Sequence, residues 1–193
     1  MKKILIIDDE EILRNIFSEF LTEIGYETLT AQDGLSGLEV FNKDKFDLII
    51  TDLTMPRMNG LDIIKAIREI DTDIPIIVVS GVHDIKEMMT AIHLGAWDYL
   101  VKPIMDLQVI EHSVSRCLER AKLIEENRKY SQNVESAVRE KTEEFQKELQ
   151  MRTAAESLLR QSFENLTKVT DQIIRTISLI GDIRDPYTGG HQH

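Results

Sequence analysis

The first hundred residues alternate short apolar runs with segments of helical periodicity, and few folds are compatible with this alternation. Runs such as KILIID at 3–8 and IPIIVVS at 74–80 are short and continuously apolar, as is typical of strands buried on both faces. The segments between them repeat apolar residues at steps of three and four. Repeated strand–helix units favour parallel strands joined by crossover helices. The pattern predicts an α/β fold with a doubly wound, five-stranded parallel sheet.

The boundaries of these elements follow from the same pattern. The predicted strands are 3–8, 27–31, 46–52, 74–80 and 98–102. The predicted helices are 10–25, 34–43, 60–70 and 85–95. The first helix ends at Gly25, and its apolar face comprises Ile12, Leu13, Ile16, Phe17, Phe20, Leu21 and Ile24.

A different kind of sequence begins after Pro103, because neither glycine nor proline occurs again before Gly181. Apolar residues from 107 to 180 recur with a mean spacing of 3.5, which is typical of a coiled-coil seam. The polar exceptions are Arg128, Ser131, Glu135, Thr142, Arg152, Glu156 and Thr170, and the seam is weakest over 125–157. The pattern predicts an α/β domain over 1–120 and a long helical coiled coil over 121–180, most simply a parallel homodimer. A solvated helix or a helical-hairpin linker is the alternative.

Composition narrows the function. The net charge of −11 argues against a nucleic-acid partner, which requires a positive surface, and suits binding of a divalent cation. The single cysteine, Cys117, excludes an intrachain disulfide. The apolar run behind the opening MKK is too short for a signal peptide, and no run reaches the roughly 20 residues of a membrane span. We therefore expect a cytoplasmic protein without a membrane partner.

Polar residues end four of the predicted strands. Asp8 and Asp9 end the first strand, Asp52 the third, Ser80 the fourth and Lys102 the fifth. The carboxyl ends of parallel strands meet at one edge of a sheet, so these side chains should converge there. Any one of them alone is a common helix-cap, turn or surface residue, but the complete set predicts a site.

Each residue type in this set suits phosphoryl-transfer chemistry. Three carboxylates together favour Mg²⁺, a cation that prefers oxygen ligands. A central carboxylate, Asp52, can act as the nucleophile and form an acyl phosphate. Lys102 can bind a phosphoryl oxygen through its charge, and Ser80 can donate a hydrogen bond to another.

Four segments resemble the receiver domain of bacterial two-component response regulators. They are ILIIDDEEILR, DLIITDLTMPRMNGLDII, PIIVVSG and GAWDYLVKPI, and the resemblance covers residues 1 to about 120. It implies a flavodoxin-like sheet of strand order 2-1-3-4-5. It also implies that Asp52 accepts a phosphoryl group from a phosphohistidine of a sensor histidine kinase.

The same resemblance implies the ligands of Mg²⁺. Asp9, Asp52 and the backbone carbonyl of Thr54 are expected to bind the ion directly, and Asp8 is expected to hold one of its water ligands.

The resemblance further implies a conformational switch. The peptide bond between Lys102 and Pro103 is expected to be cis, and Tyr99 is expected to move inward with Ser80 upon phosphorylation, although simple core packing is an equal alternative for Tyr99. The helix that begins near Asp106 would then carry the change into the coiled coil.

The last residues suggest an output domain. The stretch ISLIGDIRDPYTGGHQH resembles the opening of an HD-GYP phosphodiesterase domain, a class that hydrolyses cyclic di-GMP, with His191 at the position near the metal centre. Residues 181–193 would be the truncated start of that domain. The defining His-Asp pair and Gly-Tyr-Pro loop are not in the sequence, so this fragment is not expected to be an enzyme, whereas the full-length protein would be.

Other functions stay open at this stage. The chain could be a stand-alone dimeric receiver that acts through a protein partner. A transcription factor is disfavoured by the acidic charge, and a kinase fragment is disfavoured because His112 is the only histidine on the long helix before the terminus.

Overall fold

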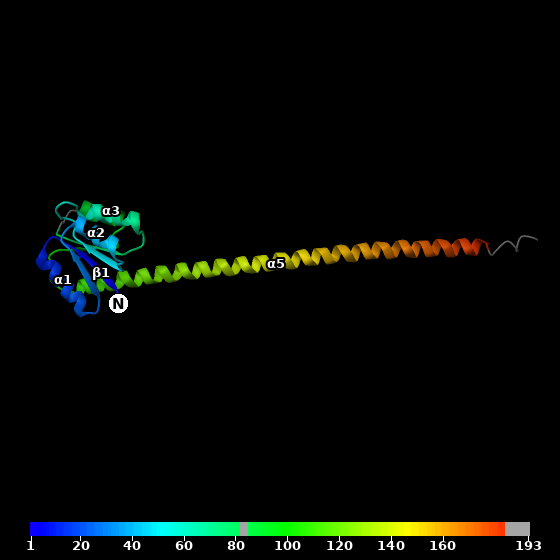
Figure 1. Ribbon diagram of the computed structural model, residues 1–193, viewed down its shortest axis with the longest axis horizontal. Coiled ribbons are helices and arrows are strands. Elements are labelled where there is room, and N and C mark those ends of the chain that lie inside the picture. Colours follow the sequence, from blue (N-terminus) through cyan, green and yellow to red (C-terminus); the bar gives the residue numbers. More distant parts are fainter. Residues whose placement is uncertain (82–84, 184–193) are drawn as a thin grey trace, which may run out of the picture. The chain divides into compact units, whose positions relative to one another are not determined.

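The chain folds into two compact units, Met1–Lys129 and Tyr130–His193. They are described from a computed structural model that covers residues 1–81 and 85–183, with side chains through 179 (Figure 1). The predicted start of an output domain falls largely on 184–193, so that segment and His191 lie outside the described residues.

A five-stranded parallel sheet forms the first unit (Figure 1). Its strands are β1 (Lys3–Ile7), β2 (Glu27–Ala31), β3 (Leu48–Thr51), β4 (Ile76–Ser80) and β5 (Asp98–Val101). The strand order is β2-β1-β3-β4-β5, so the predicted order 2-1-3-4-5 is confirmed. The strands β3 and β4 are buried along their whole length, as their continuous apolar sequences require.

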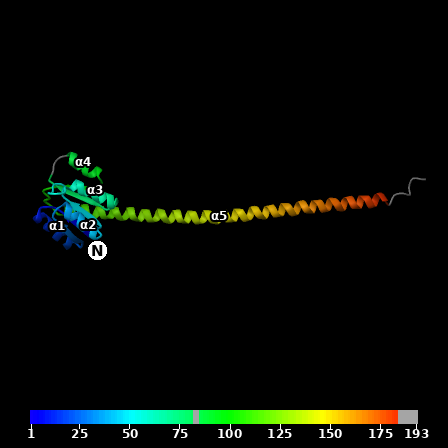
Figure 2. The ribbon, with the colours of Figure 1, turned by 45° about the horizontal axis from the view of Figure 1, so that its top comes forward.

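Helices cover both faces of this sheet. The first four are α1 (Glu11–Glu23), α2 (Gly34–Lys43), α3 (Gly60–Ile70) and α4 (Ile85–His93). One core lies between the sheet and α2, α3 and α4, and the other lies between the sheet and α1 and the first turns of α5 (Gln108–Ile183). Figure 2 shows α4 next to α3, in agreement with the core that they share. The doubly wound architecture is confirmed.

The buried face of α1 is narrower than its sequence suggests. Phe17 and Leu21 are buried against the sheet, whereas Ile12 is 75% exposed and Ile16 is 39% exposed. Phe20 also packs against this core, so the predicted apolar face is right at Phe17, Phe20 and Leu21 and wrong at Ile12.

The structure of α5 corrects the beginning of the predicted seam, from Ile110 to Cys117. Ile110, Val114 and Cys117 are buried in the core of the first unit, where they pack on the strands. These positions are unavailable to a partner helix, so any seam between two chains must begin below them. From 122 to 179 every side chain is exposed. A single long helix is confirmed over Gln108–Ile183.

A search for membrane-spanning helices among the described residues finds none with the length and apolar character required.

Asn59 is the N-cap residue of α3. Its side-chain oxygen accepts a hydrogen bond from the backbone N–H of Asp62 at 2.9 Å and caps α3. Replacing Asn59 with alanine should lower the free energy of unfolding by about 1 kcal/mol, because the N–H loses its partner. Urea unfolding measures this, with Asn42→Ala on exposed α2 surface as the control. Equal stability of the two variants would contradict the cap's contribution.

Candidate functional site

Two buried carboxylates lie at the carboxyl edge of the sheet. Asp8 follows β1 and is 2% exposed, and Asp52 follows β3 and is 5% exposed. The backbone N–H of Asp52 donates to the carbonyl oxygen of Ile7 at 2.9 Å, which extends the pairing of these two strands to the site. The predicted convergence of Asp8 and Asp52 is therefore present in the structure.

Lys102 connects the two carboxylates. Its Nζ lies 2.8 Å from Asp8 Oδ2 and 2.8 Å from Asp52 Oδ2. Burial alone would lower the pKa of Lys102, but the hydrogen bonds to Asp52 and Asp8 outweigh burial and raise the pKa above its ordinary value. The lysine is thus a fixed positive charge. The peptide bond from Lys102 to Pro103 is cis, as expected.

Backbone groups orient the carboxylate of Asp52. Its Oδ1 accepts hydrogen bonds from the backbone N–H of Leu53 at 2.6 Å and from that of Thr54 at 3.2 Å. Its Oδ2 faces Lys102. One oxygen is therefore held by the main chain, and the other is the oxygen beside the lysine.

Gly60, the first residue of α3, allows this loop to close. Its N–H donates to the carbonyl oxygen of Leu53 at 3.0 Å. A Cβ at position 60 would lie 2.1 Å from the backbone oxygen of Asp52, a distance that real Cβ atoms do not reach. Only glycine lets α3 begin this close to the site.

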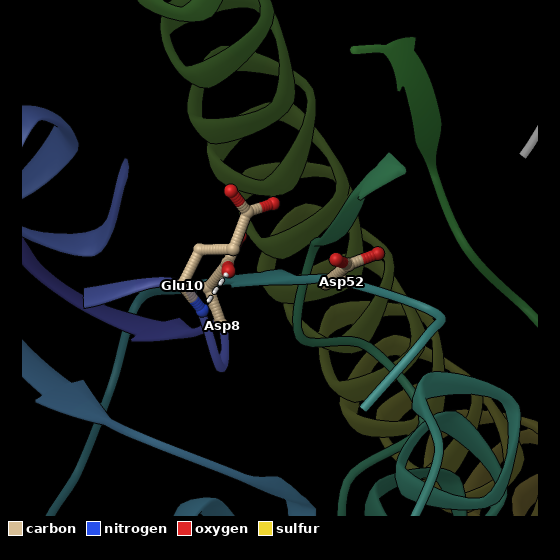
Figure 3. A group of neighbouring side chains, drawn as sticks. All are labelled: Asp8, Glu10 and Asp52. Atoms are coloured by element: carbon tan, nitrogen blue, oxygen red, sulfur yellow. Dashed lines mark hydrogen bonds between the residues drawn. The ribbon is translucent and has the colours of Figure 1, made fainter. Parts of the chain in front are cut away.

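Asp8, Glu10 and Asp52 form an acidic cluster (Figure 3). One carboxylate oxygen from each of Asp8, Glu10 and Asp52 lies within 4.8 Å of the others. Burial raises the pKa of Asp8, and the hydrogen bond from Lys102 offsets part of that rise. Carboxylates so close together favour a bound divalent cation, and oxygen ligands are those that Mg²⁺ prefers.

Glu10 is the member of this cluster that the sequence interpretation missed. Its Oε1 lies 3.3 Å from Lys102 Nζ, and its backbone N–H donates to Asp8 Oδ1 at 2.8 Å. The run DDEE carried a signal, because its third acid comes only three residues after the strand, but the predicted helix 10–25 takes in Glu10 as its first residue.

Asp9 and Thr54 border the site without joining its buried centre. Both are exposed, and both line an open cavity of about 680 Å³. The remaining lining residues are Glu10, Leu13, Phe17, Asp52, Gly81, Lys102, Pro103 and Ile104. The cavity leads to Asp52, so a phosphoryl donor can approach it.

Ser80 and Tyr99 lie beside one another on adjacent strands. Ser80 ends β4 and is fully buried, and the half-buried Tyr99 on β5 packs against the core. Burial raises the pKa of Tyr99, and a side-chain hydrogen bond with Ser80 acts in the opposite direction. The two predicted switch residues are thus in contact with each other.

Comparisons with known proteins agree with this geometry. The family model described as the response regulator receiver domain matches residues 4–115, more than half of the chain. The chain therefore belongs to the response regulator receiver family. Receiver domains of this family take part in two-component signalling, accept phosphoryl groups from sensor histidine kinases and bind Mg²⁺ at an acidic pocket.

Two curated relatives illustrate the match. A "Probable transcriptional regulator ycf27" from Galdieria sulphuraria is 44% identical over 102 residues, which are 53% of this chain and 40% of that protein. The "Regulator of RpoS" from Escherichia coli (strain K12) is 36% identical over 117 residues, which are 61% of this chain and 35% of that protein. The chain thus spans well under half the length of either relative.

Solved structures match the same region. A response regulator receiver domain protein from Clostridium thermocellum has a TM-score of 0.61 and 32% identity, covering 64% of this chain and 99% of that one. The response regulator TrrA from Thermotoga maritima, solved in complex with Mg²⁺-BeF, has a TM-score of 0.56 and 32% identity, covering 61% of this chain and 99% of that one.

Proposed function

We propose that this chain is a phosphoryl-accepting signalling protein in which Asp52 receives the phosphoryl group from a sensor histidine kinase. One observation carries the assignment: Asp52 is buried at the end of a central strand, with Oδ1 held by backbone N–H groups and Oδ2 beside Lys102. Asp8 also has both kinds of partner, but of these two aspartates it is Asp52 that lines the cavity.

The transfer would proceed by in-line displacement. Oδ2 of Asp52 supplies an electron pair to phosphorus and forms a P–O bond. The P–N bond to the donor histidine breaks, and the electron pair of that bond stays on the imidazole nitrogen. The hydrogen bonds from Leu53 and Thr54 to Oδ1 keep the carboxylate oriented during attack. Lys102 exchanges its contact with Oδ2 for a phosphoryl oxygen, whose charge it stabilises.

Asp9, Asp52 and the backbone carbonyl of Thr54 would hold Mg²⁺, with Asp8 binding one of its waters. A bound Mg²⁺ neutralises negative charge on the phosphoryl oxygens. The oxygen donors around the cavity suit this ion, and the position of Glu10 in the acidic cluster makes it a further candidate for the water shell.

Ser80 and Tyr99 would couple the phosphoryl group to the face made by α4, β5 and α5. Ser80 would rotate to donate to a phosphoryl oxygen, which breaks its hydrogen bond with Tyr99. Tyr99 would then repack into the space that Ser80 leaves, and the surface near β5 and α5 would change.

The part of α5 from 121 to 180, called the stalk from here on, would pair two copies and transmit this change. The exposed apolar residues of α5 support pairing, since Phe145, Leu159 and Phe163 are each more than 60% exposed in the single chain.

The output would be an HD-GYP domain that hydrolyses cyclic di-GMP, as the resemblance of the last residues suggests. The alternative is a stand-alone dimeric receiver that acts on a protein partner. Reading the coding DNA beyond codon 193 separates them.

Incubation with acetyl phosphate tests the phosphoryl-acceptor function. With Mg²⁺ present, intact mass spectrometry should find an adduct of about 80 Da. Chelation by EDTA should reduce its yield at least about tenfold, because the charges of the donor and the acidic cluster then repel each other. Re-addition of excess Mg²⁺ should restore it. An equal yield with and without EDTA would contradict the metal-assisted mechanism, and no adduct in Mg²⁺ would contradict the function.

A further inference from the structure

A pair of opposite charges interrupts the apolar stripe of the stalk. Arg152 and Glu156 occupy two successive positions of the predicted seam, between Leu149 on one side and Leu159 on the other. The helix continues through them without a break. Both side chains are exposed in the single chain, as are their apolar neighbours. Among the seam positions from Val138 to Ile177, Arg152 and Glu156 are the two charged residues, and they form one compact layer.

The two charges already interact within one helix. Arg152 Nε lies 3.2 Å from Glu156 Oε1. The same residue types at the same spacing occur again at Arg160 and Glu164, where the two atoms are 3.4 Å apart. Successive seam positions on this helix are 152, 156, 159 and 163, so the second pair lies one position outside the seam. The two pairs are equivalent within a helix and differ only in what a partner helix would contact.

We propose that a second copy of this chain pairs with the stalk in parallel and in register, and that Arg152 and Glu156 of both copies form one four-charge layer that fixes the register. This inference rests on the proposed dimeric stalk. The two seam levels are four residues apart, about 6 Å along the helix, so each arginine can reach the glutamate of the other copy. The charged layer of one copy is thus complementary to the same layer of a second copy.

Register follows from the cost of leaving a charge unpaired between two helices. A shift of one heptad would place Arg152 opposite Phe145 or Leu159, and Glu156 opposite Leu149 or Phe163. A buried charge without an opposite partner is strongly destabilising, whereas a paired one is tolerated. Polar residues inside coiled-coil seams specify register in this way. Among parallel pairings, the in-register one alone keeps both charges matched and both apolar flanks in contact.

Orientation follows from the lower stalk. An antiparallel pairing centred on this layer would also match the charges, but it would place Ile173 opposite Glu135 and Ile177 opposite Ser131. Parallel pairing places Ile173 and Ile177 opposite their own counterparts. Both are more than half exposed in the single chain, so the parallel arrangement buries more apolar surface.

Charge reversal tests the layer. Arg152→Glu should raise the dimer dissociation constant of the full chain, measured by sedimentation equilibrium, about a hundredfold, because four carboxylates would then meet in the seam. Glu156→Arg should act similarly, and the double exchange should restore dimerisation to within about threefold of the unchanged chain. The matched control is Arg160→Glu, which makes the same change of charge within the helix but outside the seam, and it should have little effect.

A cysteine cross-link tests the orientation. In a Cys117→Ala background, Ile173→Cys should form a disulfide between copies under mild oxidation by diamide, because the two side chains face each other in a parallel dimer. Arg175→Cys, on the outer face of the same turn, should not. Cross-linking of both or of neither would overturn the parallel, in-register arrangement.

The outcomes distinguish a failure of the charged-layer proposal from a failure of the dimer proposal. If the unchanged chain is monomeric at every concentration tested, the dimeric stalk fails and the layer fails with it. If the chain is dimeric but Arg152→Glu and Arg160→Glu weaken it equally, the stalk stands and the layer is overturned.

Discussion

Asp52→Asn is expected to abolish phosphoryl uptake from acetyl phosphate. The amide has nearly the same shape as the carboxylate, so the loop can keep its conformation, but its oxygen is a much weaker nucleophile. Lys102 would keep Asp8 and Glu10 as carboxylate partners, so the lysine remains paired. The adduct of about 80 Da seen by intact mass spectrometry should disappear.

The control for this variant is Asp62→Asn, which makes the same chemical change at an exposed carboxylate of α3. Its adduct yield should match that of the unchanged chain. An undiminished adduct on the Asp52→Asn chain would move the acceptor to another residue.

Gly60→Ala should damage both stability and phosphorylation. The added methyl group would lie 2.1 Å from the backbone oxygen of Asp52 and 2.8 Å from the Cα of Leu53, so the main chain must move. Overpacking of this kind costs about 3 kcal/mol of unfolding free energy. Because the moved segment carries the N–H groups that orient the Asp52 carboxylate, phosphorylation should also slow in the fraction that remains folded.

Gly81→Ala is the matched control, at the end of the neighbouring strand β4. A Cβ there would meet nothing nearer than the Cβ of Lys102 at 4.0 Å, an ordinary contact. Urea unfolding should show a large loss for Gly60→Ala and little change for Gly81→Ala. Equal stabilities would mean that the α3 start tolerates a side chain, and the tight-loop explanation would be wrong.

The strands of the sheet were predictable because each is marked by a short apolar run in the sequence. The strands β3 and β4 are buried on both faces, and such burial requires an unbroken apolar run that a sequence displays directly. The boundary of the buried face on α1 was not predictable, because Ile12 satisfies the helical period yet lies where no strand reaches it. The periodicity of a sequence shows which face of a helix is apolar. The neighbouring helices and strands decide how many residues of that face are buried.

The same limit applies to α5. Ile110, Val114 and Cys117 repeat with a spacing that suits either a partner helix or the chain's own sheet. Both surfaces bury a stripe of helix residues, so the pattern alone cannot distinguish them. In the structure this stripe packs on the sheet, whereas every side chain from 122 to 179 is exposed.

The site was predictable as far as strand ends define it. Asp8, Asp52 and Lys102 each follow a strand, and parallel strands bring their ends together. Glu10 was not identified because its position depends on how the chain turns from β1 into α1, which the strand pattern does not describe.

The most direct test of the phosphoryl-acceptor assignment is to locate the acyl phosphate in the unchanged chain. Borohydride reduction of the chain labelled with acetyl phosphate, followed by peptide mass spectrometry, converts the phosphorylated aspartate to a distinguishable residue. This conversion is expected at Asp52 alone. Conversion at Asp8 or Asp9 with Asp52 intact would contradict it.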